Sequence, residues 1–155
     1  MALAGEVADA ASDHEALARV VKHFAADSGT VHMIGADGLL HLLAASDGLP
    51  AHVLAVIGTI PVGKGMAGLA VERRAPVDAC NIQTDTSGDV RPGARATGLA
   101  GALVVPIFRG DDVIGALGIA NRAERTFTGD EVADLLAAGR ALAARHPDAP
   151  AAAHR

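Results

Sequence analysis

The sequence predicts a single α+β domain built on a mainly antiparallel sheet of about five strands. Two hairpin signals and two helix-start signals support this prediction. Each hairpin joins two apolar segments through a short polar turn, and each helix start is a capping box followed by apolar residues at helical spacing. Because both terminal helices carry one apolar stripe, we expect them to pack on one face of the sheet, with a ligand pocket on the other.

Composition narrows the class of protein and of ligand. The chain has 155 residues, half of them apolar, and a formal net charge of −5. This length supports one domain with a real core, and the negative charge predicts no nucleic-acid partner. The chain has no Trp or Tyr and only three Phe, so we expect a pocket of aliphatic side chains, Met and backbone. Such a pocket argues against ligands held by ring stacking, such as flavins and bilins.

The chain carries a single cysteine, Cys80, and no sign of a membrane segment. One cysteine excludes an intrachain disulfide and is typical of a reducing compartment. No apolar run reaches about 18 residues, and the N-terminus lacks a basic stretch before a long apolar run. We therefore predict a cytoplasmic protein with no membrane contact.

Three stretches are distinguished along the chain. Residues 1–11 are Ala-rich and are expected to form a flexible or loosely helical N-terminus. Residues 12–146 contain the periodic segments and form the predicted domain. Residues 147–155 begin with a proline and show no period, so we expect a disordered tail.

The predicted domain opens with a helix and a hairpin. Ser12-Asp13-His14-Glu15 is a capping box that starts the helix. Segments 30–36 and 39–45 then flank Asp37-Gly38, which is a two-residue turn signal. In the corresponding register, four side chains share one face of the hairpin: His32, Ile34, His41 and Leu43.

The middle of the chain is organised around a glycine-rich stretch, Ile60-Pro61-Val62-Gly63-Lys64-Gly65-Met66-Ala67-Gly68. Before it, residues 51–57 fit either a helix or a strand, and we favour a short helix; after it, we expect a short helix at 66–73. A helix that starts at glycines leaves unpaired N–H groups, and these carry partial positive charge that suits an anion.

A short strand is expected at 76–80, followed by a long loop at 81–98 without a clear period. Loops of this length in compact domains are often functional. Arg91 and Arg95 are candidate cations on this loop, and Pro92 can open one helical turn through Thr97.

The C-terminal part of the sequence shows the clearest strand and helix patterns. Strands at 101–108 and 113–120 are joined by Arg109-Gly110-Asp111-Asp112. The capping box Thr128-Gly129-Asp130-Glu131 then starts a helix that runs to about His146.

In order and spacing, these motifs resemble those of the GAF domain, a small-ligand sensor module. The resemblance covers about Leu17 to Leu142 and implies a six-stranded antiparallel sheet between a helical layer and a ligand pocket. It also implies dimerisation through the terminal helices, so a homodimer is expected. The family binds many ligands, so the resemblance leaves the ligand open. Four groups of residues carry it: Ile60 to Gly68; Val104-Val105-Pro106-Ile107; Val113-Ile114-Gly115-Ala116-Leu117-Gly118; and Phe127-Thr128 with Asp130-Glu131.

Stand-alone GAF proteins that bind nitrate and modulate a sensor kinase are similar in length and share Gly-Lys-Gly-(Leu/Met)-Ala-Gly. This similarity implies an anion site at the helix-start N–H groups, here those of Met66 and Ala67, although the aromatic pocket wall of those proteins is missing. We therefore predict a sensor that binds a small molecule or an anion such as nitrate and signals to a partner such as a sensor kinase. No catalytic residue is expected. The expected ligand-binding residues are Leu43, Ile60, Gly65, Met66, Ala67, Cys80, Arg91, Arg95 and Leu99.

The chain is also similar to free methionine-(R)-sulfoxide reductases, which are stand-alone GAF enzymes with the same Ile-Pro-x-Gly-Lys-Gly start. Their chemistry needs a thiolate nucleophile and a resolving thiol. The cysteines of that family fall on Ala67 and near Arg95 in this chain. A divergent reductase that uses Cys80 with an external thiol is therefore the alternative to a sensor.

Cyclic-nucleotide binding is a further alternative, because Asn121-Arg122, Phe127 and Asp130-Glu131 partly match the signature of such GAF domains. Only two residues separate Phe127 from Asp130, so the match is incomplete. A phosphate-binding loop is excluded, because Gly65 follows Lys64 where Ser or Thr would hold Mg²⁺.

No metal and no cofactor is expected. The histidines show no tight spacing, and the predicted pair His32 and His41 lacks a third ligand. A bilin would need a Cys-His pair, and Cys80 is followed by Asn81.

Overall fold

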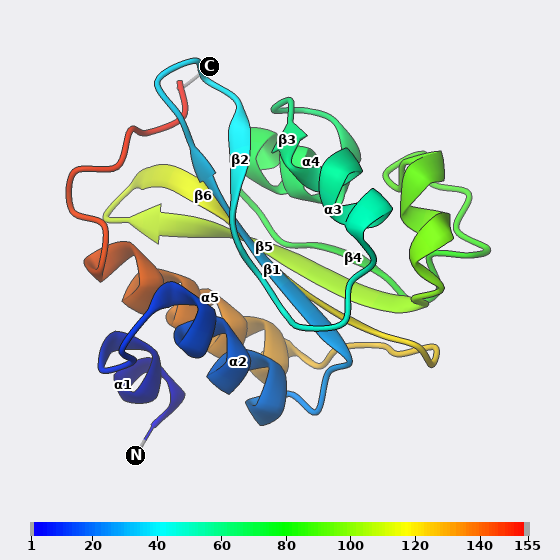
Figure 1. The fold of residues 1–155 in the computed structure, drawn as a ribbon, viewed down its shortest axis with the longest axis horizontal. Coiled ribbons are helices and arrows are strands. Elements are labelled where there is room, and N and C mark those ends of the chain that lie inside the picture. Colours follow the sequence, from blue (N-terminus) through cyan, green and yellow to red (C-terminus); the bar gives the residue numbers. More distant parts are fainter. Residues whose placement is uncertain (1, 154–155) are drawn as a thin grey trace.

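The structure is a computed structural model that describes residues 2–153, with the backbone alone at positions 92, 93 and 96. It consists of helices and antiparallel strands, and its first and last elements are helices (Figure 1). In chain order they are α1 Leu3–Ala8, α2 Asp13–His23, β1 Ser28–Ile34, β2 Leu40–Ala45, α3 Ala51–Ile57, β3 Thr59–Ile60, α4 Gly65–Arg73, β4 Val77–Ala79, the 3₁₀ helix η1 Pro92–Thr97, β5 Gly101–Arg109, β6 Asp112–Asn121 and α5 Gly129–Ala144.

The strands form one six-stranded sheet in the order β3-β2-β1-β6-β5-β4. All of its pairs are antiparallel, which confirms the predicted α+β class. The two hairpins meet at the centre, where β1 pairs with β6 although they are far apart in sequence. β3 is the strand that the sequence did not predict, because two residues are too short to show a period.

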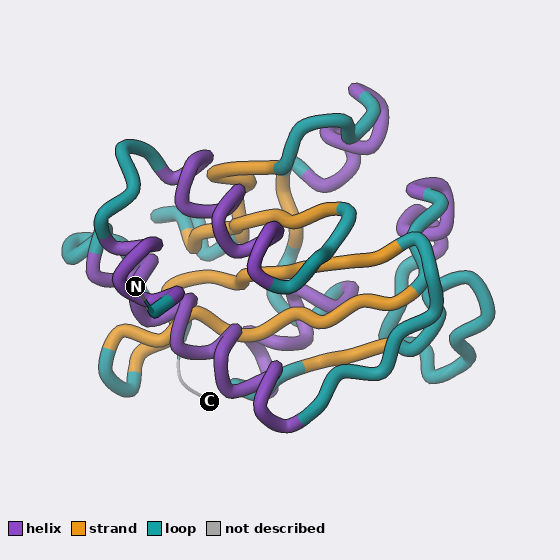
Figure 2. The backbone as a smooth tube through the Cα atoms, turned by 90° about the horizontal axis from the view of Figure 1, so that it is seen from below, coloured by secondary structure: helices purple, strands orange, loops and turns teal. Residues whose placement is uncertain are grey.

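The sheet separates two helical layers, as Figures 1 and 2 show. α1, α2 and α5 cover one face, and the largest core cluster lies between these helices and the sheet. Leu17, Leu117 and Leu135 are fully buried there. α3, α4 and η1 lie over the opposite face. The predicted placement of both terminal helices on one face is therefore confirmed.

Both ends of the chain pack more closely than the sequence predicted. Where a flexible N-terminus was expected, α1 packs against α5 and buries Val7 completely. A helix of six residues is too short to show an apolar stripe, so its contact with the core cannot be seen from spacing.

The described part of the expected tail also lies against the domain. The Arg109 guanidinium donates hydrogen bonds to the carbonyls of Pro147 and Ala149, at 3.1 and 2.6 Å. The N–H of Ala152 donates to the carbonyl of Val113 at 2.7 Å. The apolar period ends at α5, so the sequence carried no signal for these main-chain contacts.

The first hairpin has a different register from the predicted one. Ile34 pairs with Leu40 and His32 with Leu42, and a bulge follows between Val31 and His32. β1 ends at Ile34 and β2 begins at Leu40, so the loop 35–39 has five residues rather than two, and within it the N–H of Gly35 donates to the carbonyl of Leu39. A shift of one residue moves a side chain to the other face of a sheet. The prediction that His32 and His41 share a face is therefore wrong.

The two terminal helices are joined by a polar cluster at Asp13. Arg145 Nε donates to Asp13 Oδ1 at 3.1 Å, and His146 Nε2 lies 3.0 Å from the same oxygen. Burial alone would raise the pKa of Asp13, but the hydrogen bonds from His146 and Arg145 outweigh it and hold the pKa below its ordinary value. The cluster therefore depends on an ionised Asp13.

Asp13→Asn is expected to lower the free energy of unfolding by about 1–2 kcal/mol at pH 7. A lowered carboxyl pKa stabilises the folded state above the unfolded-state pKa, and this contribution is lost as the pH falls through the folded-state pKa. The difference between wild type and variant should therefore shrink below about pH 4. Urea unfolding at pH 7, 5 and 3 measures it, with Asp78→Asn, at an exposed position on β4, as the control. A difference that is constant with pH would contradict the role of the charge.

Candidate functional site

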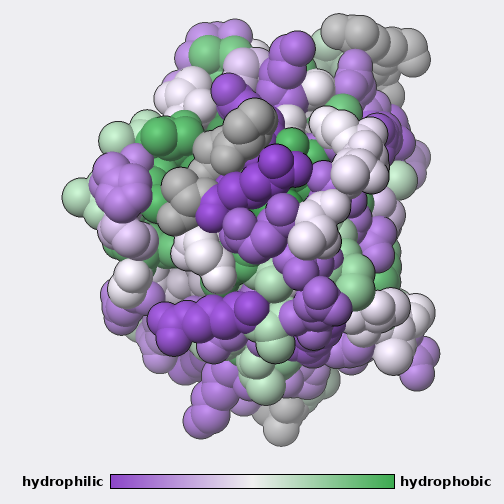
Figure 3. All heavy atoms as spheres, turned by 90° about the vertical axis from the view of Figure 1, so that its right-hand side faces the viewer, coloured by the Kyte–Doolittle hydropathy of each residue, from purple (hydrophilic) through white to green (hydrophobic). Residues whose placement is uncertain are grey.

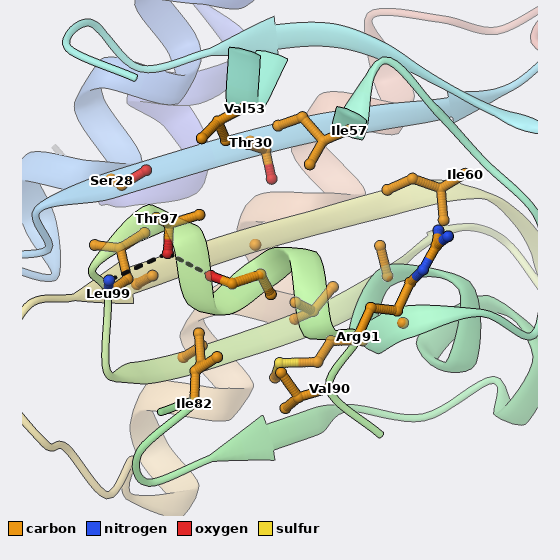
Figure 4. A pocket seen from close by; sticks show the side chains of 18 of the residues that line it. Ser28, Thr30, Val53, Ile57, Ile60, Ile82, Val90, Arg91, Thr97 and Leu99 are labelled. Carbon is orange, nitrogen blue, oxygen red and sulfur yellow. Dashed lines mark hydrogen bonds between the residues drawn. The ribbon is translucent and has the colours of Figure 1, made fainter. Parts of the chain in front are cut away.

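A cavity of about 290 Å³ lies between the sheet and the layer formed by α3, α4 and the loop 81–98 (Figure 4). Its volume is at the lower end of the range for small-molecule sites. Figure 3 views the molecule from the side that carries η1 in Figure 1, and hydrophobic side chains lie between hydrophilic ones on that side.

The wall of the cavity is mostly aliphatic. Small residues on β5 and β6 leave room above the sheet. They are Ala102 on β5 and Gly118 and Ala120 on β6. Among the described residues no Phe side chain lines it, and the His32 imidazole is the one ring in its wall. The other lining residues are Ser28, Gly29, Thr30, His32, Leu49, Val53, Val56, Ile57, Ile60, Lys64, Gly65, Met66, Ala67, Ile82, Val90, Arg91, Ala94, Thr97, Leu99, Val104 and Ile119.

The start of α4 brings backbone donors to the cavity. Lys64 is the N-cap residue and makes no side-chain cap, and the N–H of Gly68 donates to its carbonyl at 3.2 Å. The N–H groups of Gly65, Met66 and Ala67 precede that bond and have no acceptor within the helix. All three residues line the cavity.

Gly68 allows the glycine-rich stretch to pack onto α4. A Cβ atom at this position would lie 2.4 Å from the carbonyl oxygen of Pro61 and 3.1 Å from the nitrogen of Gly63. The N–H of Gly63 also donates to the Gly68 carbonyl at 2.9 Å. The turn before α4 is therefore held against the helix that it starts.

The loop 81–98 forms the outer wall of the cavity and is tied to α4. Arg73 Nη1 and Nη2 donate to the two carboxylate oxygens of Asp89, both at 2.9 Å. The next residues, Val90 and Arg91, line the cavity. The Arg91 stem lies over Gly65, where an added Cβ would meet its Cδ at 3.0 Å. Figure 4 shows the Arg91 guanidinium pointing toward Ile60.

Two cations therefore lie at the α4 end of the cavity. Arg91 is exposed, and Lys64 also lines the site. Within the described part of the chain neither side chain makes a hydrogen bond or an ion pair. Both charges are available to a ligand.

His32 is the most deeply buried polar side chain of the site, with 3% of its surface exposed. Its Nε2 lies 2.8 Å from the carbonyl oxygen of Ile57, at the end of α3. Burial lowers the pKa of His32, and the hydrogen bond to Ile57 opposes this effect without cancelling it.

The structure brings six of the nine predicted ligand-binding residues to the cavity: Ile60, Gly65, Met66, Ala67, Arg91 and Leu99. It places Leu43, Cys80 and Arg95 elsewhere. Leu43 is 41% exposed, because the observed register puts Leu42 rather than Leu43 opposite His32. Cys80 is exposed beyond β4, with its Sγ 3.7 Å from Thr126 Oγ1. Arg95 donates to the carbonyls of Ile82 and Asp85 and so holds the loop together.

Sequence reasoning missed the lining residues on β1 and α3. With the observed hairpin register, which places His32 among apolar neighbours, we would have predicted His32 as a lining residue. Nothing in the α3 segment distinguishes its cavity-lining residues, Val53, Val56 and Ile57, from the others.

Other sequence motifs have structural roles. Phe127 is buried in the core on the helix face, away from the cavity. Thr128 and Glu131 form a complete capping box at α5, and Glu131 also pairs with Arg125. Within residues 2–153, no three His, Cys, Asp or Glu side chains are grouped so as to hold a metal ion. None of the described helices has the length and apolar character needed to cross a bilayer.

Comparison with known proteins places these features in a family context. The sequence matches the profile of the GAF domain over residues 14–145. No curated protein matches it. The GAF domain of an Acinetobacter phosphoenolpyruvate-protein phosphotransferase is 19% identical, with a TM-score of 0.74 over 96% of this chain and 92% of that one.

Two further structures show the same fold. The GAF domain of the Coxiella burnetii phosphoenolpyruvate-protein phosphotransferase is 24% identical, with a TM-score of 0.72 over 92% of this chain and 86% of that one. The free methionine-R-sulfoxide reductase of Neisseria meningitidis, solved with its substrate, is 19% identical, with a TM-score of 0.74 over 94% of this chain and 84% of that one.

Proposed function

The chain belongs to the GAF domain family, and from this premise we propose that it is a regulatory domain that binds a small anionic molecule in the cavity beneath α4. One observation carries the proposal: two cations and three backbone N–H groups that have no acceptor among the described residues lie at one end of a mostly aliphatic cavity. Burying an anion costs much free energy unless donors surround it, and a helix start supplies them.

The size of the cavity favours an anion with an apolar part. Nitrate has four heavy atoms, so in a cavity of about 290 Å³ it would leave most of the aliphatic wall without contacts. A short organic acid can place its carboxylate at α4 and its carbon chain against that wall. Nitrate remains the inorganic candidate.

Thermal unfolding and calorimetry with a panel of nitrate, nitrite, iodide, sulfate and short carboxylates test this function. An anion that binds should raise the stability by about 2.7 kcal/mol at a hundred times its Kd. Arg91→Gln should weaken its binding about tenfold, because a charge-assisted hydrogen bond is lost. Lys22→Gln, the same change of charge on exposed α2 across the sheet, is the control. The proposal fails if no anion stabilises the protein, or if both variants weaken binding equally.

The ligand state would pass to a partner protein, such as a sensor kinase, through the terminal helices of a homodimer. The loop 81–98 supplies five lining residues, so a ligand would order it and pull on β5 and β6. α5 packs directly on β5, which offers a path to the helix face. Hydrogen exchange that is the same in this loop, α2 and α5 with and without ligand would refute this path.

The enzymatic alternative is a divergent sulfoxide reductase that uses Cys80. That thiol is exposed outside the cavity, so a substrate in the cavity would not meet it in this conformation. A thiol-coupled turnover assay of the wild type and of Cys80→Ser separates the two functions. A reductase that uses Cys80 would lose its sulfoxide-reducing activity in the variant, whereas a sensor has no such activity to lose.

A further inference from the structure

The tautomer of His32 follows from its hydrogen bond. A carbonyl oxygen accepts only, so Nε2, at 2.8 Å from the Ile57 oxygen, carries the proton and donates it. Burial lowers the pKa of the ring, so it is neutral at pH 7. Nδ1 is then the unprotonated nitrogen and can only accept a hydrogen bond.

Nδ1 faces the cavity. Among the described residues no group hydrogen-bonds to it. Every fully enclosed side-chain nitrogen or oxygen in the same part of the chain has a hydrogen-bond partner. Nδ1 has none, so it is not fully enclosed and is in contact with open space. Since 97% of the residue is shielded from solvent and the side chain lines the cavity, that space is the cavity itself.

The cavity therefore contains polar groups of opposite hydrogen-bonding character. The start of α4 and Arg91 only donate and His32 Nδ1 only accepts, while the hydroxyls of Ser28, Thr30 and Thr97 can do both. A simple anion would satisfy the donors and leave Nδ1 without a partner in an apolar wall. A ligand that also carries an N–H or O–H group would satisfy both.

We propose that His32 selects the ligand, and that the ligand is a small carboxylic acid that also bears a hydroxyl or an amino group as a donor to His32 Nδ1. This inference rests on the proposed anion-binding function and specifies its ligand class. The protein should prefer such an acid over its analogue without the donor by about 10- to 100-fold, because the analogue leaves a buried acceptor unpaired.

Three acids of one carbon skeleton test the selection by calorimetry: 3-methylbutanoate, 2-hydroxy-3-methylbutanoate and 2-amino-3-methylbutanoate. The wild type should bind at least one of the last two about tenfold or more tightly than the first. In His32→Gln, the terminal amide nitrogen can still donate to the Ile57 carbonyl while Nδ1 is removed, so this preference should disappear. Equal binding of all three acids by the wild type overturns the role of His32 and leaves the anion site standing. If none of the three acids binds, both the role of His32 and the anion site are overturned for this class of ligand.

A second measurement needs no variant. Nitrogen-15 NMR of the histidine rings in the unliganded wild type at pH 7 should show one ring protonated at Nε2 alone. Addition of the hydroxy or amino acid should shift its Nδ1 resonance, and 3-methylbutanoate should leave that resonance in place. A buried ring protonated at Nδ1, or at both nitrogens, overturns the proposal even if acids bind.

Discussion

Gly68→Ala is expected to lower the free energy of unfolding by about 2 kcal/mol, against the usual preference for Ala in helices. Gly68 lies inside α4, where propensity alone would favour Ala by about 1 kcal/mol. The added Cβ would lie 2.4 Å from the Pro61 oxygen, and a backbone atom cannot move away as a flexible side chain can. The turn before α4 would therefore shift away from the helix, and ligand affinity should fall with stability.

Urea unfolding of Gly68→Ala beside Gly129→Ala provides the matched comparison. Gly129 is at the start of α5, and a Cβ there would meet no atom within 4 Å. This control should gain up to about 1 kcal/mol. If both variants gained stability, the close contact between Gly68 and Pro61 would be refuted.

Ala102→Leu is expected to weaken binding of any cavity ligand by at least about 100-fold, which is about 2.7 kcal/mol, while the free protein remains folded. Ala102 is buried on β5, and it packs with Ile82, Val90 and Leu99 in the cavity wall. A leucine side chain would occupy the space that the ligand needs. Because it fills an existing void, the unliganded protein should gain about 1 kcal/mol in stability.

Calorimetry with the best ligand of the panel measures the loss of affinity, and urea unfolding measures the stability. Ala133→Leu, at an exposed position on α5, makes the same substitution away from the cavity and should bind as the wild type does. Binding that survives Ala102→Leu would show that the ligand site lies elsewhere on the protein.

The elements with long, clear patterns were predictable from sequence. The capping box at Thr128 and the second hairpin are local signals, and tertiary contacts do not override them. The first hairpin was not predictable, because Asp37-Gly38 is a two-residue turn signal inside a five-residue loop. The Asp37 carboxylate accepts from the N–H of Leu39 and contacts His41, and such side-chain bonds compete with the simple turn.

The part of the site that was predictable from sequence is the part whose residues also determine the local structure. The glycine-rich stretch must start a helix, so the donors of Gly65, Met66 and Ala67 followed from the sequence alone. The loop 81–98 gave no such information, since Arg91 and Arg95 are equivalent until the chain is folded. Only the fold reveals that Arg95 bonds to its own loop while Arg91 turns to the cavity.

The segment after α5 connects surfaces that the sheet keeps apart. Ala149 packs against the core on the helix face, whereas Ala152 packs against the cluster that includes Ile60 and Ala67 of the cavity wall. Between them the chain rounds the end of the β5–β6 hairpin, where Arg109 holds it. Residues 149–152 therefore contact both layers of the domain at one edge of the sheet.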